Sequence, residues 1–137
     1  MGNENYYQFA ENDYEMLAFL VKNEQVKNGM CSLAQNCCEK YLKHIIKEYI
    51  PETDENFKDY SFYMRTHNLK NLCRFLKINF PDFQFNTNKI CQADGFYFSS
   101  RYPGKDSSFV IKDDVDSCWE AVQYTKMIVD EFLNSYN

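Results

Sequence analysis

The sequence MCSLAQNCCEKYLKHIIKEY, residues 30–49, is the strongest helical signal in this chain. Its apolar side chains recur at steps of three and four, a spacing that places them on one face of an α-helix. This face consists of Cys31, Ala34, Cys37, Cys38, Tyr41, Leu42, Ile45, Ile46 and Tyr49. A helix with so wide an apolar stripe must be covered by other helices, so the stretch predicts an all-α fold.

The opposite face of this helix carries Lys40, Lys43, His44 and Lys47. Such a run predicts a face exposed to solvent, with His44 as a surface residue. Glu39 lies at the boundary between the two faces, next to the apolar stripe. A carboxylate in that position needs a cationic or hydrogen-bonding partner, because burying it alone is unfavourable.

The other segments predict an up-and-down bundle of four main helices with one additional short helix, in a single domain over residues 1–137. Residues 1–8 are expected to be a frayed tail, and the first helix to run from residue 12 or 13 to about 23. Residues 52–63 predict a loop with at most one helical turn. Further helices are expected after Thr66 as the N-cap, over about 88–100, and from 112–116 onward. Gly95, inside the helix predicted over 88–100, is interpreted as a mark of close helix packing.

Composition excludes several function classes. The net charge of −5 and the pI near 5.0 argue against sequence-independent binding of a phosphate backbone by the whole surface. The six cysteines form no CxxC pair, so we expect buried free thiols, no metal site and no cofactor. The sequence shows no apolar run of membrane-spanning length and no secretion signal, which predicts a cytoplasmic protein.

Three short motifs occur in order along the chain: AQNCCEKYLK at residues 34–43, THNL at 66–69, and Tyr97 followed by RYP at 101–103. This combination resembles the HEPN domain, the higher eukaryote and prokaryote nucleotide-binding family, over roughly residues 10–135. The resemblance implies a small helical bundle. It also implies a pairing with a small nucleotidyltransferase, as a toxin–antitoxin pair or as a substrate-binding subunit.

Other members of that family are metal-independent ribonucleases that use an arginine, four to six further residues and then a histidine, assembled across a dimer. After Arg65, Arg74 and Arg101 the required positions are 70–72, 79–81 and 106–108, and none of them is histidine. The leading hypothesis is therefore a non-catalytic module that binds a nucleotide-like ligand or a nucleotidyltransferase. The alternatives are a ribonuclease toxin in which His67 and Arg101 converge in space, and a purely structural bundle.

The residues expected to bind a ligand are Glu39, Lys40, His67, Arg101 and Tyr102. Two interpretations of Arg101 stay open. It forms a buried ion pair with Glu39 that joins two helices, or it binds nucleotide phosphate together with Lys40 and Tyr102. His67 is either a helix-capping residue or a functional one.

Two further features concern surfaces. The basic stripes Lys40-Lys43-Lys47 and Lys70-Arg74-Lys77 are either solvated helix faces or, if they adjoin, one docking strip for phosphate or an acidic partner. A nucleotide and RNA both stay open as ligands of the chain. The chain also contains 12 Phe, 11 Tyr and 1 Trp, more aromatic area than a few short helices can bury. This excess predicts a homodimer.

Overall fold

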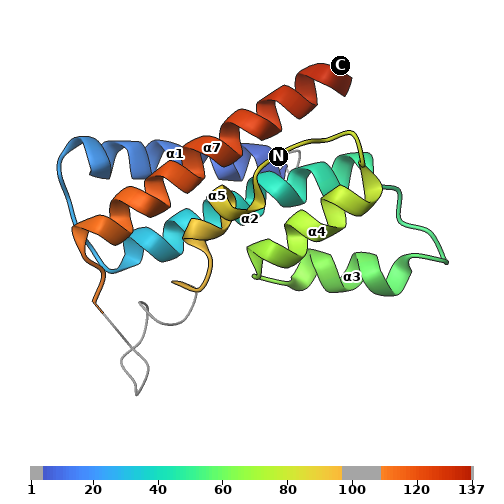
Figure 1. The fold of residues 1–137 in the computed structure, drawn as a ribbon, viewed down its shortest axis with the longest axis horizontal. Coiled ribbons are helices and arrows are strands. Elements are labelled where there is room, and N and C mark those ends of the chain that lie inside the picture. The colour runs from blue at the N-terminus through green and yellow to red at the C-terminus, as the bar shows by residue number, and fades with distance from the viewer. Residues whose placement is uncertain (1–4, 97–108, 137) are drawn as a thin grey trace.

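The structure, a computed structural model, describes residues 5–96 and 109–136, and all regular secondary structure in these ranges is helical. The elements in order are α1 (Tyr6–Lys22), α2 (Gly29–Tyr49), α3 (Phe57–Arg65), α4 (Leu69–Asn79), α5 (Thr87–Ile90), a 3-10 turn (Cys91–Ala93) and α7 (Lys112–Tyr136) (Figure 1). The predicted all-α bundle is confirmed. None of the described helices is long and apolar enough to cross a membrane.

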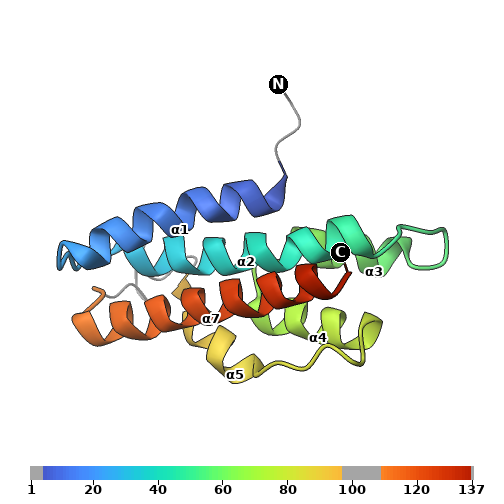
Figure 2. The ribbon, with the colours of Figure 1, turned by 90° about the horizontal axis from the view of Figure 1, so that it is seen from above.

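Helix α2 is the centre of the bundle. It packs against α1, α4 and α7, with α1 antiparallel to it and α7 running alongside in the same direction (Figures 1 and 2). The side chains of Tyr41, Leu42, Ile45 and Ile46 are fully buried, so the predicted apolar stripe is the main part of the core. The opposite face, Lys40, Lys43, His44 and Lys47, is solvated only in part, because Lys47 is exposed and Lys40 is half-buried.

Lys43 and His44 correct that prediction. Lys43 is 4% exposed and His44 is 7% exposed, although both belong to the predicted outer face. The physical reason is that α2 has neighbours on several sides, so positions that would face water in a two-layer arrangement are covered. The imidazole of His44 lies 5.6 Å from the ring of Tyr7 on α1.

The first helix begins earlier than predicted. Asn5 caps it, because its side chain accepts a hydrogen bond from the backbone N–H of Gln8, and the Gln8 side chain accepts one from the N–H of Asn5. This reciprocal capping box satisfies backbone donors that a helix start otherwise leaves unpaired. The prediction of a frayed tail is therefore wrong for residues 5–8, and Tyr6 is already helical.

The segment predicted as a loop contains α3, whose only buried residue is Tyr60. One buried position cannot produce a hydrophobic period, which is why the pattern was not visible in the sequence.

The N-cap of the next helix, α4, is Asn68 and not Thr66. The predicted start of the last helix at 112–116 agrees with α7.

The helix predicted over residues 88–100 begins where expected, but it is not continuous in its described part. α5 and one 3-10 turn cover residues 87–93, and Gly95 then interrupts the helix with a φ of 89°, a conformation that glycine adopts without strain, before Phe96 is helical again. No described atom lies within 4 Å of the place where a Cβ of Gly95 would be, so this glycine serves the turn and not close helix packing. Tyr97, Arg101, Tyr102 and the remainder of the RYP motif lie outside the described residues.

Candidate functional site

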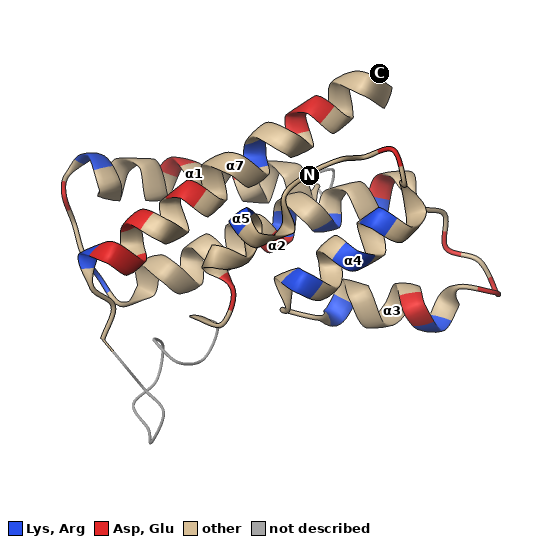
Figure 3. Ribbon diagram, viewed as in Figure 1, with Lys and Arg blue, Asp and Glu red and all other residues tan. Residues whose placement is uncertain are grey.

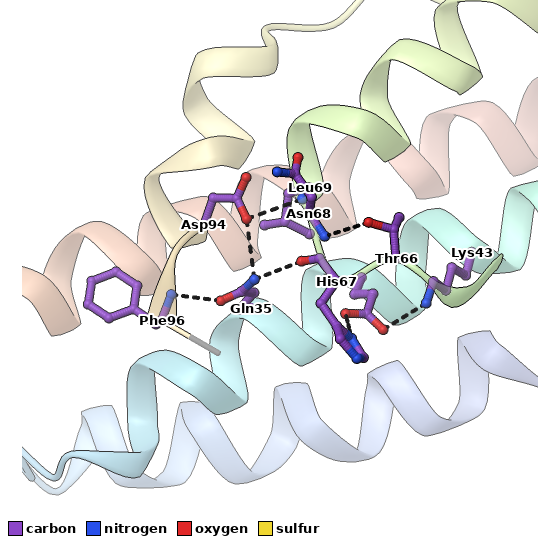
Figure 4. Close-up of polar contacts among 9 residues, drawn as sticks. Gln35, Lys43, Thr66, His67, Asn68, Leu69, Asp94 and Phe96 are labelled. Carbon is purple, nitrogen blue, oxygen red and sulfur yellow. Dashed lines mark hydrogen bonds and ion pairs between the residues drawn. The ribbon is translucent and has the colours of Figure 1, made fainter. Parts of the chain in front are cut away.

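The carboxylate of Glu39 contacts both Lys43 and His67, the two partners that Figure 4 labels. Its Oε2 accepts a hydrogen bond from Lys43 Nζ at 2.9 Å, one helical turn along α2. Its Oε1 lies 2.9 Å from Nδ1 of His67, in the link between α3 and α4. The side chains of Glu39 and Lys43 are 11% and 5% exposed, whereas that of His67 is 43% exposed. The expected cationic partner of Glu39 is thus confirmed, and it is Lys43.

Gln35, one turn before Glu39 on α2, forms hydrogen bonds to two other segments, the link that contains His67 and the turn that contains Asp94 and Phe96. Its Nε2 donates to the carbonyl of His67 at 2.7 Å and to Asp94 Oδ1 at 3.2 Å. Its Oε1 accepts from the backbone N–H of Phe96 at 2.8 Å. One buried amide therefore fixes the His67 link and the turn after α5 against α2.

Asp94 completes the arrangement at the N-terminus of α4. Its two carboxylate oxygens accept hydrogen bonds from the backbone N–H groups of Leu69 and Lys70, at 3.2 and 3.3 Å. Asn68 adds a local cap by accepting from the N–H of Asn71 at 2.9 Å. A negative charge at a helix N-terminus is stabilised by the helix dipole as well as by these hydrogen bonds. We call Gln35, Glu39, Lys43, His67 and Asp94 the motif site.

The motif site can orient an imidazole. A neutral His67 ring that carries its proton on Nδ1 donates to Glu39, which leaves Nε2 as the basic nitrogen. A carboxylate that fixes the tautomer in this way is a recurring part of general base catalysis. The arrangement also has a purely structural use, because it joins the start of α4 to α2.

Not all residues predicted for the ligand site come together. Glu39 and His67 do, but Lys40 points to α1, where its Nζ lies 2.7 Å from Asp13 Oδ2. Arg101 and Tyr102 lie outside the described residues, so the pairing of Glu39 with Arg101 stays a prediction. Gln35 and Asp94 were missed, and Asp94 carries no local sequence signal because the backbone that it caps lies more than 20 residues away.

The side chains of the second predicted basic stripe line one exposed pocket. Lys70, Arg74 and Lys77 line a shallow pocket of about 360 Å³ together with Ile78 and Thr87, and we call it the basic hollow. Figure 3 shows the positive positions that follow one another along α4. No carboxylate is among its described lining residues. Lys70 connects the hollow to the motif site, because its backbone N–H donates to Asp94.

The first stripe does not extend this surface. Lys40 is paired with Asp13 and Lys43 is buried against Glu39, which leaves Lys47 as the exposed member. The single docking strip expected from two adjoining stripes therefore does not form, because two of the three lysines of the first stripe are already paired with carboxylates. Of the two stripes, only Lys70, Arg74 and Lys77 form a basic surface, which is the basic hollow.

A separate polar cluster joins α7 to α1. Lys126 Nζ lies 2.6 Å from Glu11 Oε1 and 3.2 Å from Asp130 Oδ2, and the Tyr7 hydroxyl donates to Asp130 at 2.6 Å. Burial disfavours the charge of Lys126, but its hydrogen bonds to Glu11, Asp130 and Tyr7 outweigh that effect and raise its pKa. Burial and the bond to Asp130 raise the pKa of Tyr7 to about 12. Every charged member has a partner within the cluster, which is typical of a structural ion-pair network.

The cysteine thiols are unpaired in the described parts of the chain. All six cysteines are free, and five of them are buried, as the sequence predicted, whereas Cys91 is partly exposed. Among residues 5–96 and 109–136, no group of three or more His, Cys, Asp or Glu side chains is arranged to hold a metal ion.

Comparison with known proteins gives one finding on ancestry. The family model of the HEPN domain matches residues 4–135, nearly the whole chain. Neither the comparison with curated proteins nor that with solved structures gave a match.

Proposed function

The chain belongs to the HEPN domain family, and from this premise we propose that it is a non-catalytic module that binds a nucleotide-like ligand or associates with a nucleotidyltransferase. The observation that carries the proposal is the basic hollow. Three cationic side chains gather there on a protein whose net charge is −5, so the hollow is a local site for an anion on an otherwise acidic molecule.

The composition of the hollow fits a phosphate-bearing ligand. Arg74 offers a guanidinium that binds phosphate oxygens in pairs, and the lysines on either side supply further charge. Ile78 is 66% exposed and adds an apolar surface against which a base or ribose can pack. The absence of histidine at the family's catalytic spacing supports a binding role over a catalytic one.

Calorimetric titration with nucleoside mono-, di- and triphosphates tests ligand binding. We expect affinity to rise with the number of phosphates, and Arg74→Ala to weaken binding about tenfold without a change in melting temperature. Lys58→Ala, which removes an exposed lysine from α3, is the matched control and should bind as the wild type does. Equal affinity in all three proteins would show that the hollow is not the site.

Co-purification tests the partner. We expect the chain to co-elute on a sizing column with a nucleotidyltransferase encoded in a neighbouring reading frame, when the two are co-expressed. Separate elution together with unchanged melting in the presence of every nucleotide would eliminate the binding module as a whole.

One observation favours a second function, a ribonuclease with a displaced histidine. The 2.9 Å contact between Glu39 and His67 orients a ring that is 43% exposed, as a general base requires. Incubation with total RNA decides between the two. Cleavage that His67→Asn abolishes and Arg74→Ala retains would favour the ribonuclease, whereas intact RNA with the wild-type protein favours the binding module.

A further inference from the structure

A second pocket, unrelated to the basic hollow, lies between the loop after α4 and the C-terminal end of α7. It has a volume of about 490 Å³, within the usual range of small-molecule sites. Aromatic rings come from Phe80, Phe83, Phe132 and Tyr136, and carboxylates come from Asp82 and Glu131. We call it the aromatic pocket. No lysine or arginine is among its described lining residues.

The rings of the aromatic pocket are held in place by one another. Phe132 is buried, and its ring stacks on Tyr136 with centroids 4.5 Å apart and an interplanar angle of 20°. Phe80 meets Phe132 edge to face at 4.9 Å, and Phe83 lies at the same distance. The walls are therefore formed before any ligand arrives, which lowers the entropic cost of binding.

The charges of the pocket are unbalanced. Asp82 and Glu131 are both exposed, and neither carboxylate has an ion-pair partner among the described residues. Aromatic faces carry a negative quadrupole, so rings and carboxylates attract the same sign of charge.

The same aromatic cluster already holds one cation. The ammonium of Lys77 lies 4.7 Å from the ring centroid of Phe85, and that ring packs on Phe83 at 4.9 Å. A cation over an aromatic ring is thus a contact that the structure itself contains, beside the aromatic pocket, since Phe85 packs on the lining residue Phe83.

We propose that the aromatic pocket binds an organic cation of the alkylammonium class. Its apolar alkyl groups would contact the rings of Phe80, Phe83 and Tyr136, and its charge would be balanced by Asp82 and Glu131. An inorganic cation is a poorer fit, because hard metal ions require a shell of several oxygen ligands that aromatic walls do not supply. The negative lining disfavours phosphate, so this site is distinct from the basic hollow.

The test compares choline with its uncharged carbon analogue, in which a tert-butyl group replaces the trimethylammonium group. An amide-resolved NMR titration of the full chain should show shifts confined to residues 80–84 and 131–136. We expect choline to bind about tenfold more tightly than the uncharged analogue, because only the charge differs. Equal affinity of the two, or no saturable shift of these amides up to about 50 mM choline, would overturn the proposal.

Variants locate the charge and the rings. Glu131→Gln and Asp82→Asn should each weaken choline binding several-fold, whereas Glu55→Gln, an exposed carboxylate in the loop before α3, should leave it unchanged. Tyr136→Leu should weaken binding while the remaining amide spectrum shows a folded protein. Arginine amide serves as a second probe, and tighter binding of it than of choline would overturn the alkylammonium assignment in favour of a guanidinium group.

Discussion

Glu39 balances the buried ammonium of Lys43 and also contacts the partly exposed imidazole of His67, so its removal affects both. In Glu39→Gln, Lys43 stays buried without a counterion. We expect a loss of about 3 to 5 kcal/mol in the free energy of unfolding, because breaking one partner of a buried pair strands the other charge. Urea denaturation of both proteins measures this loss.

The exposed pair Lys112–Asp116 provides a matched control. It has the same spacing along a helix and nearly the same length, 2.8 Å against 2.9 Å, but its side chains are 75% and 56% exposed. Asp116→Asn should therefore leave the unfolding midpoint unchanged, since solvent screens such pairs. Similar losses in both variants would mean that burial of Glu39 is not the cause.

His44 makes stability depend on pH. Burial lowers its pKa, with Glu48 partly opposing this, and its Nδ1 has no hydrogen-bond partner among the described residues. A lowered folded-state pKa means that the unfolded chain binds the proton more readily than the folded chain does. The folded state therefore has its full stability above a pH of about 6.5, where His44 is neutral in both states, and loses stability as the pH falls below that value. Unfolding free energies at about pH 7.5 and 5.5 should show the decline.

The variant His44→Phe isolates this effect. It retains an aromatic ring beside Tyr7 but cannot titrate, so the decline in stability between these two pH values should become smaller. A slope identical to that of the wild type would assign the pH dependence to other groups.

Cys91 should be the most reactive of the six thiols. It is the partly exposed one, and a hydrogen bond from Cys73 lowers its pKa although burial opposes this. Burial raises the pKa of Cys37 and Cys38, so those thiols stay protonated. Reaction with a chromogenic disulfide reagent should begin with one fast thiol, which Cys91→Ser removes and Cys37→Ser retains. A fast phase that persists in Cys91→Ser would refute this assignment.

Among the helices, α4 depends most on a distant residue for its start. Asp94→Ala removes the acceptor of the Leu69 and Lys70 amides, and we expect a loss of about 1 to 2 kcal/mol. Hydrogen exchange of these amides should accelerate. Asn86→Ala, which removes the cap of the four-residue helix α5, is the comparison and should cost less. Equal losses would indicate a general packing effect and not capping.

The helices that the sequence did and did not predict differ in one physical respect. Helix α2 buries a continuous face and is visible from its period, whereas α3 buries Tyr60 alone and has no period. The start of α1 does have a local signal, since Asn5 and Gln8 have the spacing of a capping box. The cap of α4 by Asp94 had none, because it arises from the fold.

For the molecule as a whole, homodimer formation stays a prediction, and α1 offers the surface for its test. Phe9, Met16 and Phe19 are 54%, 52% and 57% exposed, and their spacing places them on one side of that helix. Light scattering at tens of micromolar should give about twice the chain mass of 16.4 kDa, and Phe19→Glu should restore the monomer mass. Phe57→Glu on α3 is the matched control, at 54% exposed. A monomer mass for the unaltered chain would refute the dimer.

By itself, the sequence determined the helical class, the central place of residues 30–49, the motifs of the HEPN family and the need of Glu39 for a partner. Only the tertiary structure decided that Lys43 is a partner of Glu39 and that Lys43 and His44 are buried. It also decided that Lys70, Arg74 and Lys77, and not the first basic stripe, line an exposed pocket. The reason is that a helix's own pattern records which face is apolar. It does not record how many neighbours cover the polar face, and that number sets both the burial of a charge and the group that balances it.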